Sequence, residues 1–156
     1  MDKLINLSTT TLAASPSGKV SGGIWLRVGE HDFPEREWSD YPVVLLAWWL
    51  EAMDKLQTGS VAKAECNFMD GPWHFELEPT GANWRLRLVD GHKKGSASLV
   101  GEGLVAPDAL VKQTLTAARA VVAECRRHSW RPADLPTLER EIERSAARLK
   151  AKGSVG

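Results

Sequence analysis

A run of eight apolar residues, 43–50, has to be buried wherever this chain folds. As a helix the run would be about 12 Å long, whereas the hydrocarbon core of a bilayer is about 30 Å thick. The sequence has no longer clean apolar run, so we expect no membrane span and no membrane partner. A helix that is apolar on every face must be covered on every face. The run therefore predicts the central helix of a folded domain.

The residues around this run carry signals for both ends of a helix. Pro42 is suited to the first turn because it has no N–H group to leave unpaired, and Ser39 or Asp40 can cap the helix just before it. Gly59 is suited to end the helix. We expect a helix over residues 40–56 that packs at the centre of the domain.

Three segments after this helix alternate between apolar and polar residues, as strands do when one face is buried. The residues predicted to face inward are Ala62, Ala64, Cys66, Phe68, Trp73, Phe75, Leu77, Trp84, Leu86 and Leu88. Pairing Cys66 with Phe75 leaves a two-residue turn at 70–71. The same logic places Leu77 opposite Trp84 in the next hairpin.

The remaining segments complete an α+β fold. Residues 4–12 and 22–29 are suited to strands, and 22–29 is apolar on both faces, which indicates an interior strand. Residues 96–105 can return as a further strand. A helix with an apolar stripe follows from Pro107, and a last helix is expected over about 135–150. We predict an antiparallel sheet of about five or six strands packed on the central buried helix, with two C-terminal helices.

Size and composition are typical of a single domain over residues 1–156. The mass is 17.1 kDa, and 43% of the residues are hydrophobic, which is too apolar for a disordered chain. The N-terminus lacks the basic start and apolar block of a signal peptide, so we expect a cytoplasmic protein. Residues 109–156 contain 10 basic and 5 acidic residues. Their mixed charges and single tryptophan favour a solvated helix surface over a nucleic-acid site.

Motifs for catalysis and cofactor binding are absent from the sequence. The glycines have neither the dinucleotide-binding nor the phosphate-loop spacing, and no Gly-x-Ser-x-Gly turn for a serine nucleophile occurs. Glu30, His31 and Asp32 are adjacent, so in an extended chain their side chains alternate in direction and make a poor metal site. The four histidines lie in polar contexts, and we expect them to be exposed. We predict a protein that is not an enzyme and has no cofactor and no metal.

The two cysteines, Cys66 and Cys125, fall at positions predicted to face inward. Two buried free thiols are a better interpretation than a disulfide in a reducing compartment. Two cysteines also cannot form a zinc site unaided.

Residues 30–41 combine five acidic and three aromatic residues, and we call this segment the acidic loop. It shows neither helical nor strand periodicity. Aromatic side chains supply buried area in an interface and charges steer a partner of opposite sign, so the segment predicts a surface for a basic protein. The predicted partner-binding residues are Asp32, Phe33, Glu35, Glu37, Trp38 and Tyr41. An equally simple alternative is that Phe33 and Trp38 attach the loop to the core.

Four segments resemble small bacterial immunity proteins, which are encoded beside secreted or contact-delivered toxins. They read Gly-Ile-Trp-Leu-Arg-Val at 23–28, Trp-Ser-Asp-Tyr-Pro-Val-Val-Leu-Leu-Ala-Trp-Trp-Leu at 38–50, Phe-Met-Asp-Gly-Pro-Trp at 68–73 and Trp-Arg-Leu-Arg at 84–87. The likeness covers most of the chain and lies in general character rather than in a diagnostic motif. It implies a protein that neutralises a cognate toxin by stoichiometric binding, without catalytic residues. The acidic loop would then face the toxin.

Two other functions stay open at the level of sequence. The chain could be a small enzyme or ligand carrier with a pocket between the sheet and the central helix, or a structural subunit that pairs with itself through its basic C-terminal helices. A large pocket with convergent polar groups would favour the former. The outer sheet face with His74, Arg85 and Arg87 is the alternative protein-binding surface. The sequence indicates neither the oligomeric state nor the identity of a toxin.

Overall fold

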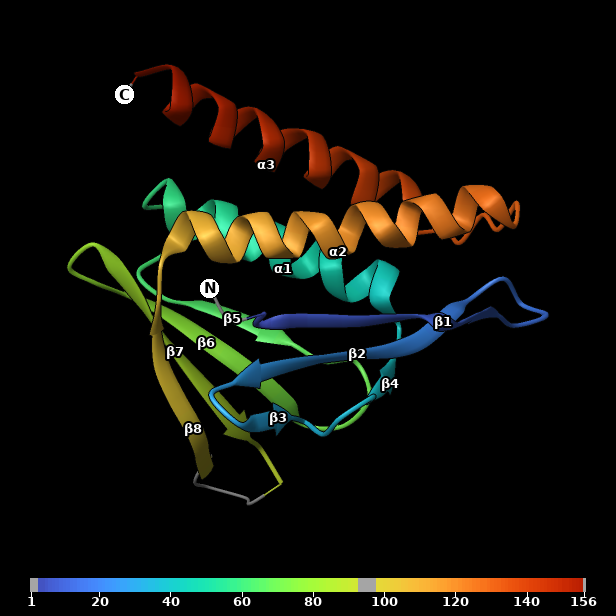
Figure 1. Ribbon diagram of the computed structural model, residues 1–156, viewed down its shortest axis with the longest axis horizontal. Coiled ribbons are helices and arrows are strands. Elements are labelled where there is room, and N and C mark those ends of the chain that lie inside the picture. The colour runs from blue at the N-terminus through green and yellow to red at the C-terminus, as the bar shows by residue number, and fades with distance from the viewer. Residues whose placement is uncertain (1–2, 93–97, 156) are drawn as a thin grey trace.

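The computed structural model describes residues 3–92 and 98–155 and has an α+β architecture, as predicted (Figure 1). Residues 96 and 97, the start of the expected last strand, lie outside the described residues. The elements in chain order are β1 (Ile5–Ala14), β2 (Val20–Val28), β3 (His31–Phe33), β4 (Ser39–Asp40), α1 (Pro42–Gln57), β5 (Ala64–Asn67), β6 (Trp73–Thr80), β7 (Asn83–Asp90), β8 (Ser98–Val105), α2 (Pro107–Arg127) and α3 (Leu135–Val155).

The strands of the described residues form two antiparallel sheets of four strands each, instead of the single sheet of five or six that we expected. In sheet A, β2 pairs with β1 along one edge and with β3 and β4 along the other. Sheet B has the order β5-β6-β7-β8. The four strands of sheet A precede α1 in the chain, and the four strands of sheet B follow it (Figure 1). The interior position predicted for β2 is confirmed.

The hairpin of β5 and β6 has the register expected from the sequence. Ala64 lies opposite Leu77, and Cys66 lies opposite Phe75. Beyond them, the N–H group of Phe68 donates a hydrogen bond of 3.0 Å to the carbonyl of Trp73. The predicted inward face is confirmed for Ala64, Cys66, Phe68, Phe75 and Leu77, which are buried. It is wrong for Ala62, which precedes β5 and is exposed, and Trp73 is only half-buried.

The next hairpin, β6 with β7, is shifted by two residues from the expected register. Leu77 lies opposite Leu86 instead of Trp84, and the turn shortens to residues 81–82. Gly81 has a φ of 62°, in the left-handed region that favours glycine. A shift of two residues leaves every side chain on its original face. Trp84 and Leu86 are accordingly buried, as predicted.

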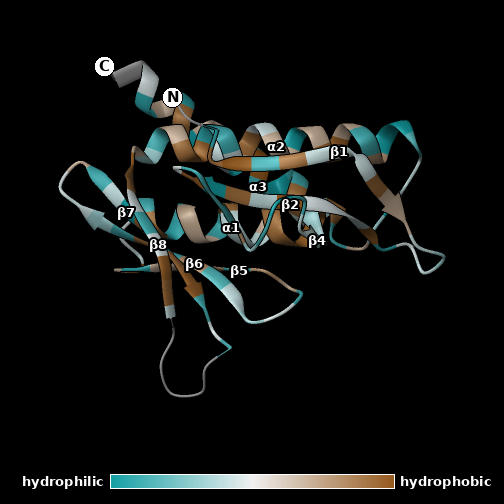
Figure 2. Ribbon diagram, turned by 60° about the horizontal axis from the view of Figure 1, so that its bottom comes forward, coloured by the Kyte–Doolittle hydropathy of each residue, from teal (hydrophilic) through white to brown (hydrophobic). Residues whose placement is uncertain are grey.

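Helix α1 is enclosed between α2 and α3 on one side and sheet B on the other (Figure 2). Leu45, Trp49 and Leu50 are fully buried. The indole N–H of Trp49 donates a hydrogen bond of 2.8 Å to the carbonyl of Asn67. The prediction of a central helix is confirmed, with one exception on its surface, because the side chain of Trp48 is 43% exposed.

Helix α2 lies along β1, and α3 packs against α1 and α2 as the outermost element (Figure 1). The predicted apolar stripe of α2 is buried and consists of Val111, Leu115, Ala118, Val122 and Cys125. Leu138 is fully buried on α3. In the described part of the chain, no helix combines the length and apolar character needed to cross a membrane.

Both cysteines are free and buried, as expected. Burial raises the pKa of the Cys66 and Cys125 thiols, and the negative charges of neighbouring glutamates act in the same direction. The thiolate is the nucleophilic form of cysteine, so a buried thiol with a raised pKa is a poor nucleophile.

Candidate functional site

The acidic loop is held at both ends by β2. Phe33 of β3 lies opposite Leu26, and Asp40 of β4 lies opposite Gly22. The sequence predicted no strand here, because the paired stretches are two and three residues long and too short to show a period. They pair because β2 otherwise has unpaired backbone groups along this edge. Residues 34–38 connect the two short strands across the edge of sheet A.

Four aromatic side chains from the acidic loop and the β5–β6 hairpin form what we call the aromatic cluster: Phe33, Trp38, Phe68 and Trp73. The ring centroid of Phe33 is 5.9 Å from that of Phe68 and 5.6 Å from that of Trp73, both edge to face. Trp38 lies 6.2 Å from Trp73. Phe33 is 1% exposed, whereas Trp38 and Trp73 are half-buried. The cluster joins the acidic loop to the core and leaves two tryptophans partly accessible.

Asp40 connects the acidic loop to the β5–β6 turn through its carboxylate. One oxygen accepts a hydrogen bond of 2.8 Å from the N–H of Tyr41. The other accepts from the indole N–H of Trp38 at 3.0 Å and from the N–H of Asp70 at 3.1 Å. The residue is 2% exposed. The expectation that Ser39 or Asp40 caps α1 is wrong, because the residue at the N-cap is Tyr41 and no side chain caps the helix.

Asp32 is engaged by neighbours on β2 rather than free on the surface. Its carboxylate accepts a hydrogen bond of 3.2 Å from the indole N–H of Trp25. It also lies 3.6 Å from the guanidinium of Arg27. The side chain is 20% exposed, so it supports the strand pairing and contributes little free charge.

Tyr41 lies apart from the other predicted residues. Its ring has the ammonium group of Lys19 at 5.9 Å from the centroid, and it lines a cavity that none of the other five residues reaches. Of the predicted set, the structure therefore brings Glu35, Glu37 and Trp38 together at the surface, with the two glutamates exposed. Phe33 lies beneath them in the core.

Trp73 is the residue of this surface that the sequence argument missed. Its place in an alternating stripe predicted a core position, and the structure leaves it half-buried beside Trp38. It is the first residue of β6 and follows the exposed turn at 70–72. A stripe residue at the very end of a strand is covered on fewer sides than one in the middle, and this was the available signal.

The outer face of sheet B carries His74 between two carboxylates. Its Nε2 is 3.1 Å from Glu76 and its Nδ1 is 4.0 Å from Glu65. The side chain is 15% exposed, so the expectation of an exposed imidazole is wrong here, because these neighbours cover the ring. The other three histidines are exposed, as expected.

Glu65, His74 and Glu76 present ligand atoms that all lie within 4.8 Å of one another, and such a set could hold a metal ion. The ammonium group of Lys63 lies 3.5 Å from Glu76 and supplies positive charge at the same place. Partial burial raises the pKa of Glu76, but the hydrogen bond with His74 and the charge of Lys63 outweigh it, so the pKa is lowered overall. The same side chains, together with Lys63, also form an ion-pair network that needs no metal ion.

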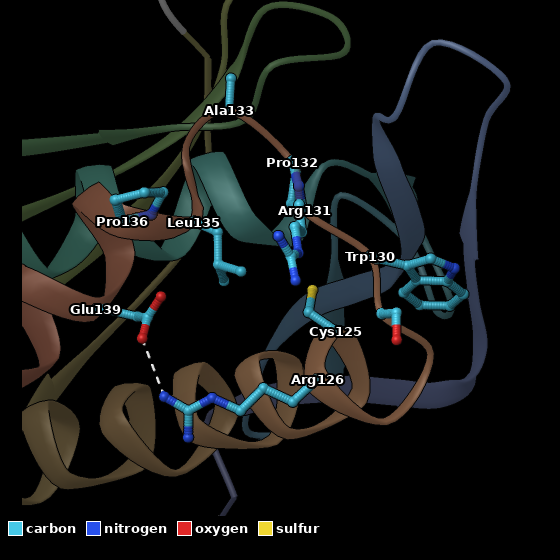
Figure 3. A pocket seen from close by; sticks show the side chains of 10 residues that line it. Cys125, Arg126, Trp130, Arg131, Pro132, Ala133, Leu135, Pro136 and Glu139 are labelled. Carbon is cyan, nitrogen blue, oxygen red and sulfur yellow. Dashed lines mark hydrogen bonds and ion pairs between the residues drawn. The ribbon is translucent and has the colours of Figure 1, made fainter.

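A cavity of about 560 Å³ lies at the corner between α2 and α3 (Figure 3). Cys125, Trp130 and Arg131 line it together with an ion pair, in which Arg126 and Glu139 lie 3.0 Å apart. A nucleophile would need a base beside it to be activated. Burial raises the pKa of the one thiol in this lining, Cys125, and the one carboxylate, Glu139, is paired with Arg126, so these two groups do not form such a couple.

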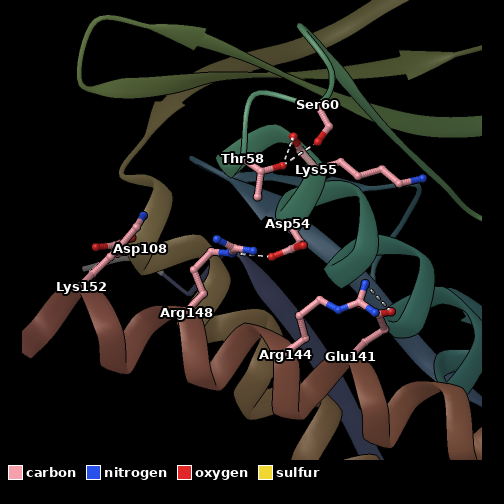
Figure 4. Close-up of polar contacts among 9 residues, drawn as sticks. All are labelled: Asp54, Lys55, Thr58, Ser60, Asp108, Glu141, Arg144, Arg148 and Lys152. Atoms are coloured by element: carbon pink, nitrogen blue, oxygen red, sulfur yellow. Dashed lines mark hydrogen bonds and ion pairs between the residues drawn. The ribbon is translucent and has the colours of Figure 1, made fainter.

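Helix α3 is fastened to α1 and α2 by ion pairs (Figure 4). Arg148 pairs with Asp54 of α1, and Lys152 lies 3.1 Å from Asp108 of α2. Glu141 faces α1 and is 6% exposed; one of its carboxylate oxygens lies 3.3 Å from Arg144, and the other is buried without a hydrogen-bond partner. Burial, and to a lesser degree nearby carboxylates, raises the pKa of Glu141 although Arg144 opposes the shift.

Comparison with family models, curated proteins and solved structures finds no match for this chain. Its function therefore has to be argued from its own surface. The exposed carboxylates of the acidic loop beside Trp38 and Trp73 are the surface with the clearest chemical character.

Proposed function

We propose that this protein binds a basic protein partner through the acidic loop and acts as an immunity protein that neutralises a bacterial toxin. The observation that carries the proposal is a pair of half-buried tryptophans, Trp38 of the acidic loop and Trp73 of β6, whose ring centroids lie 6.2 Å apart beside the exposed glutamates of the loop. Tryptophan is enriched among the residues that dominate binding energy. The identification with immunity proteins rests on the resemblance of the sequence.

Charge supports a basic partner. Glu30, Glu35 and Glu37 are exposed on the acidic loop, and Asp70 is exposed on the adjoining turn. Arg36 is the one basic residue of the acidic loop. Carboxylates at the rim of an interface accelerate the approach of a basic protein, and this effect weakens as salt screens the charges.

Rigidity also supports a binding role. The acidic loop is paired with β2 at both ends, and Asp40 accepts two hydrogen bonds from within the loop and one from Asp70 of the β5–β6 turn. A surface that is ordered before binding loses less conformational entropy on association than a mobile one. Phe33 contributes here as the buried support of the two tryptophans rather than as a contact residue.

We expect a gene beside that of this chain to encode the toxin domain, and the experiment uses that domain as the partner. The two proteins are purified separately, and their complex is measured by titration calorimetry together with survival of cells that express the toxin with and without this chain. We expect a one-to-one complex and protection by the wild-type chain. The variant Trp38→Ala should lose protection, whereas the control Glu78→Gln, an exposed glutamate on β6, should keep it. Absence of a complex would contradict the proposal.

A further inference from the structure

A second cavity, of about 490 Å³, lies where four segments distant in sequence meet. The turn between β1 and β2 contributes Lys19 and Val20, the start of α1 contributes Tyr41 and Val44, and the α2–α3 connection contributes Arg131. Met69 from the β5–β6 turn completes this wall. The volume lies within the range of about 300–1,000 Å³ that is typical of small-molecule sites.

The walls of this cavity are apolar and partly open to solvent. Val20 and Val43 are buried beneath it, while Val44 is half-buried and the side chain of Met69 is 43% exposed. Methionine adapts its shape readily to an apolar ligand. A hydrocarbon or aromatic body placed here would remove apolar surface from water.

The charges of the lining favour an anion. Lys19 and Arg131 are exposed and, among the described residues, form no ion pair with a carboxylate; the ammonium group of Lys19 lies over the ring of Tyr41 instead. Asp134 is the single acid of the lining, so one positive charge remains uncompensated. Arg131 also borders the α2–α3 cavity, where Figure 3 shows its side chain.

The start of α1 adds backbone N–H groups, which also favour an anion. No side chain caps this helix, and its first turn contains no acidic residue. Asp40, the nearest carboxylate in the chain, is occupied by three other hydrogen bonds. The N–H groups of Val43 and Val44 precede the first intrahelical bond, which runs from Leu45 to Tyr41. They are therefore free to donate to an anion.

We propose that this cavity binds a small carboxylate with an apolar body, such as an aliphatic or aryl acid. The carboxylate meets Lys19 and Arg131 at the rim, and the apolar body lies against Val44 and Met69. The site is separate from the surface formed by Glu35, Glu37 and Trp38, so it does not depend on the proposed function.

The test is a titration of the isotopically labelled full chain with decanoate, below its micelle concentration, followed by amide chemical shifts. We expect saturable binding with a dissociation constant below about 1 mM. The shifts should concentrate at Gly18, Val44 and Met69. The neutral analogue decanol should bind at least about fivefold more weakly, because the loss of a charged hydrogen bond costs about 1 kcal/mol or more. Equal affinity for the two probes, or shifts centred elsewhere, would overturn the proposal.

Substitutions distinguish binding at this cavity from non-specific hydrophobic binding elsewhere on the protein. Lys19→Gln and Arg131→Gln should each weaken decanoate binding about fivefold and leave decanol binding unchanged. Val44→Trp, which fills the cavity, should abolish binding of both probes. The control Arg85→Gln removes an exposed cation on sheet B and should change neither affinity. Each variant is first shown to be folded by its amide spectrum. If the folded charge variants bind decanoate as tightly as the wild type, the assignment is wrong.

Discussion

At the scale of single residues, Asp40 shows how one buried carboxylate organises the candidate surface. It accepts hydrogen bonds from Trp38, Tyr41 and Asp70, so it holds together the acidic loop, the start of α1 and the β5–β6 turn. The sequence suggested a helix cap because aspartate is common at that position. Two of the donors, Trp38 and Tyr41, are local in sequence, but the third, Asp70, is brought to Asp40 by a tertiary contact for which local sequence carries no signal.

Replacing Asp40 with alanine should destabilise the protein strongly. The change leaves up to three N–H groups without an acceptor, and we expect a loss of about 2–4 kcal/mol in the free energy of unfolding. Denaturant unfolding followed by tryptophan fluorescence measures it. Glu35→Ala, an exposed change in the same loop, should alter the free energy by less than about 0.5 kcal/mol. Equal effects of the two substitutions would contradict this role of Asp40.

Glu141 leads to a prediction about pH. Because its pKa is raised in the folded state, the folded protein binds this proton more tightly than the unfolded chain, so Glu141 lowers stability as the pH rises through the raised pKa. Glu141→Gln should increase the free energy of unfolding at pH 7.5 by up to about 1 kcal/mol. The difference should vanish at a pH low enough to protonate the glutamate.

The matched control for this prediction is Glu143→Gln, an exposed glutamate two residues further along α3. It should leave the free energy of unfolding unchanged at both pH values. A Glu141→Gln variant that is less stable than the wild type at pH 7.5 would show that the ion pair with Arg144, 3.3 Å away, outweighs the burial of the carboxylate.

At the scale of elements, the alternation of apolar and polar residues predicted which faces of β5, β6 and β7 are buried, but it did not predict the register in which β6 pairs with β7. Phe75 and Leu77 are inward in the expected register and also in the observed one, because a shift of two residues preserves the face. The observed register follows from the short turn at Gly81, and the sequence argument instead assumed a longer loop. The helices were easier to predict, since the run at 43–50 and the stripe of α2 each repeat over several turns.

Gly81 tests the register directly. Its φ of 62° makes a side chain unfavourable, so Gly81→Ala should lower the free energy of unfolding by about 1–2 kcal/mol. Gly153→Ala, within α3 and without close contacts, should raise it by up to about 1 kcal/mol. Thermal unfolding of the two variants gives the comparison. If Gly81→Ala has no effect, the two-residue turn and the register that depends on it are incorrect.

At the scale of the whole molecule, two layers of packing hold the acidic loop in place. α1 fills the space between sheet B and the outer helices (Figure 2). The aromatic cluster joins sheet A to sheet B through the contact of Phe33 with Trp73. The composition of the acidic loop was visible in the sequence. The division of its residues between surface and core was not, because Phe33 and Trp38 have the same apolar character and differ only in what covers them.

The most direct test of the proposed binding surface is the kinetics of complex formation, at several salt concentrations, with the toxin domain that we expect a neighbouring gene to encode. The double variant Glu35→Gln, Glu37→Gln should slow association severalfold at low salt and have little effect at high salt, because it removes steering charge. Trp38→Ala should leave association nearly unchanged and raise the dissociation rate by about thirtyfold, which corresponds to about 2 kcal/mol. If both folded variants keep the wild-type rates at every salt concentration, the acidic loop is not the interface.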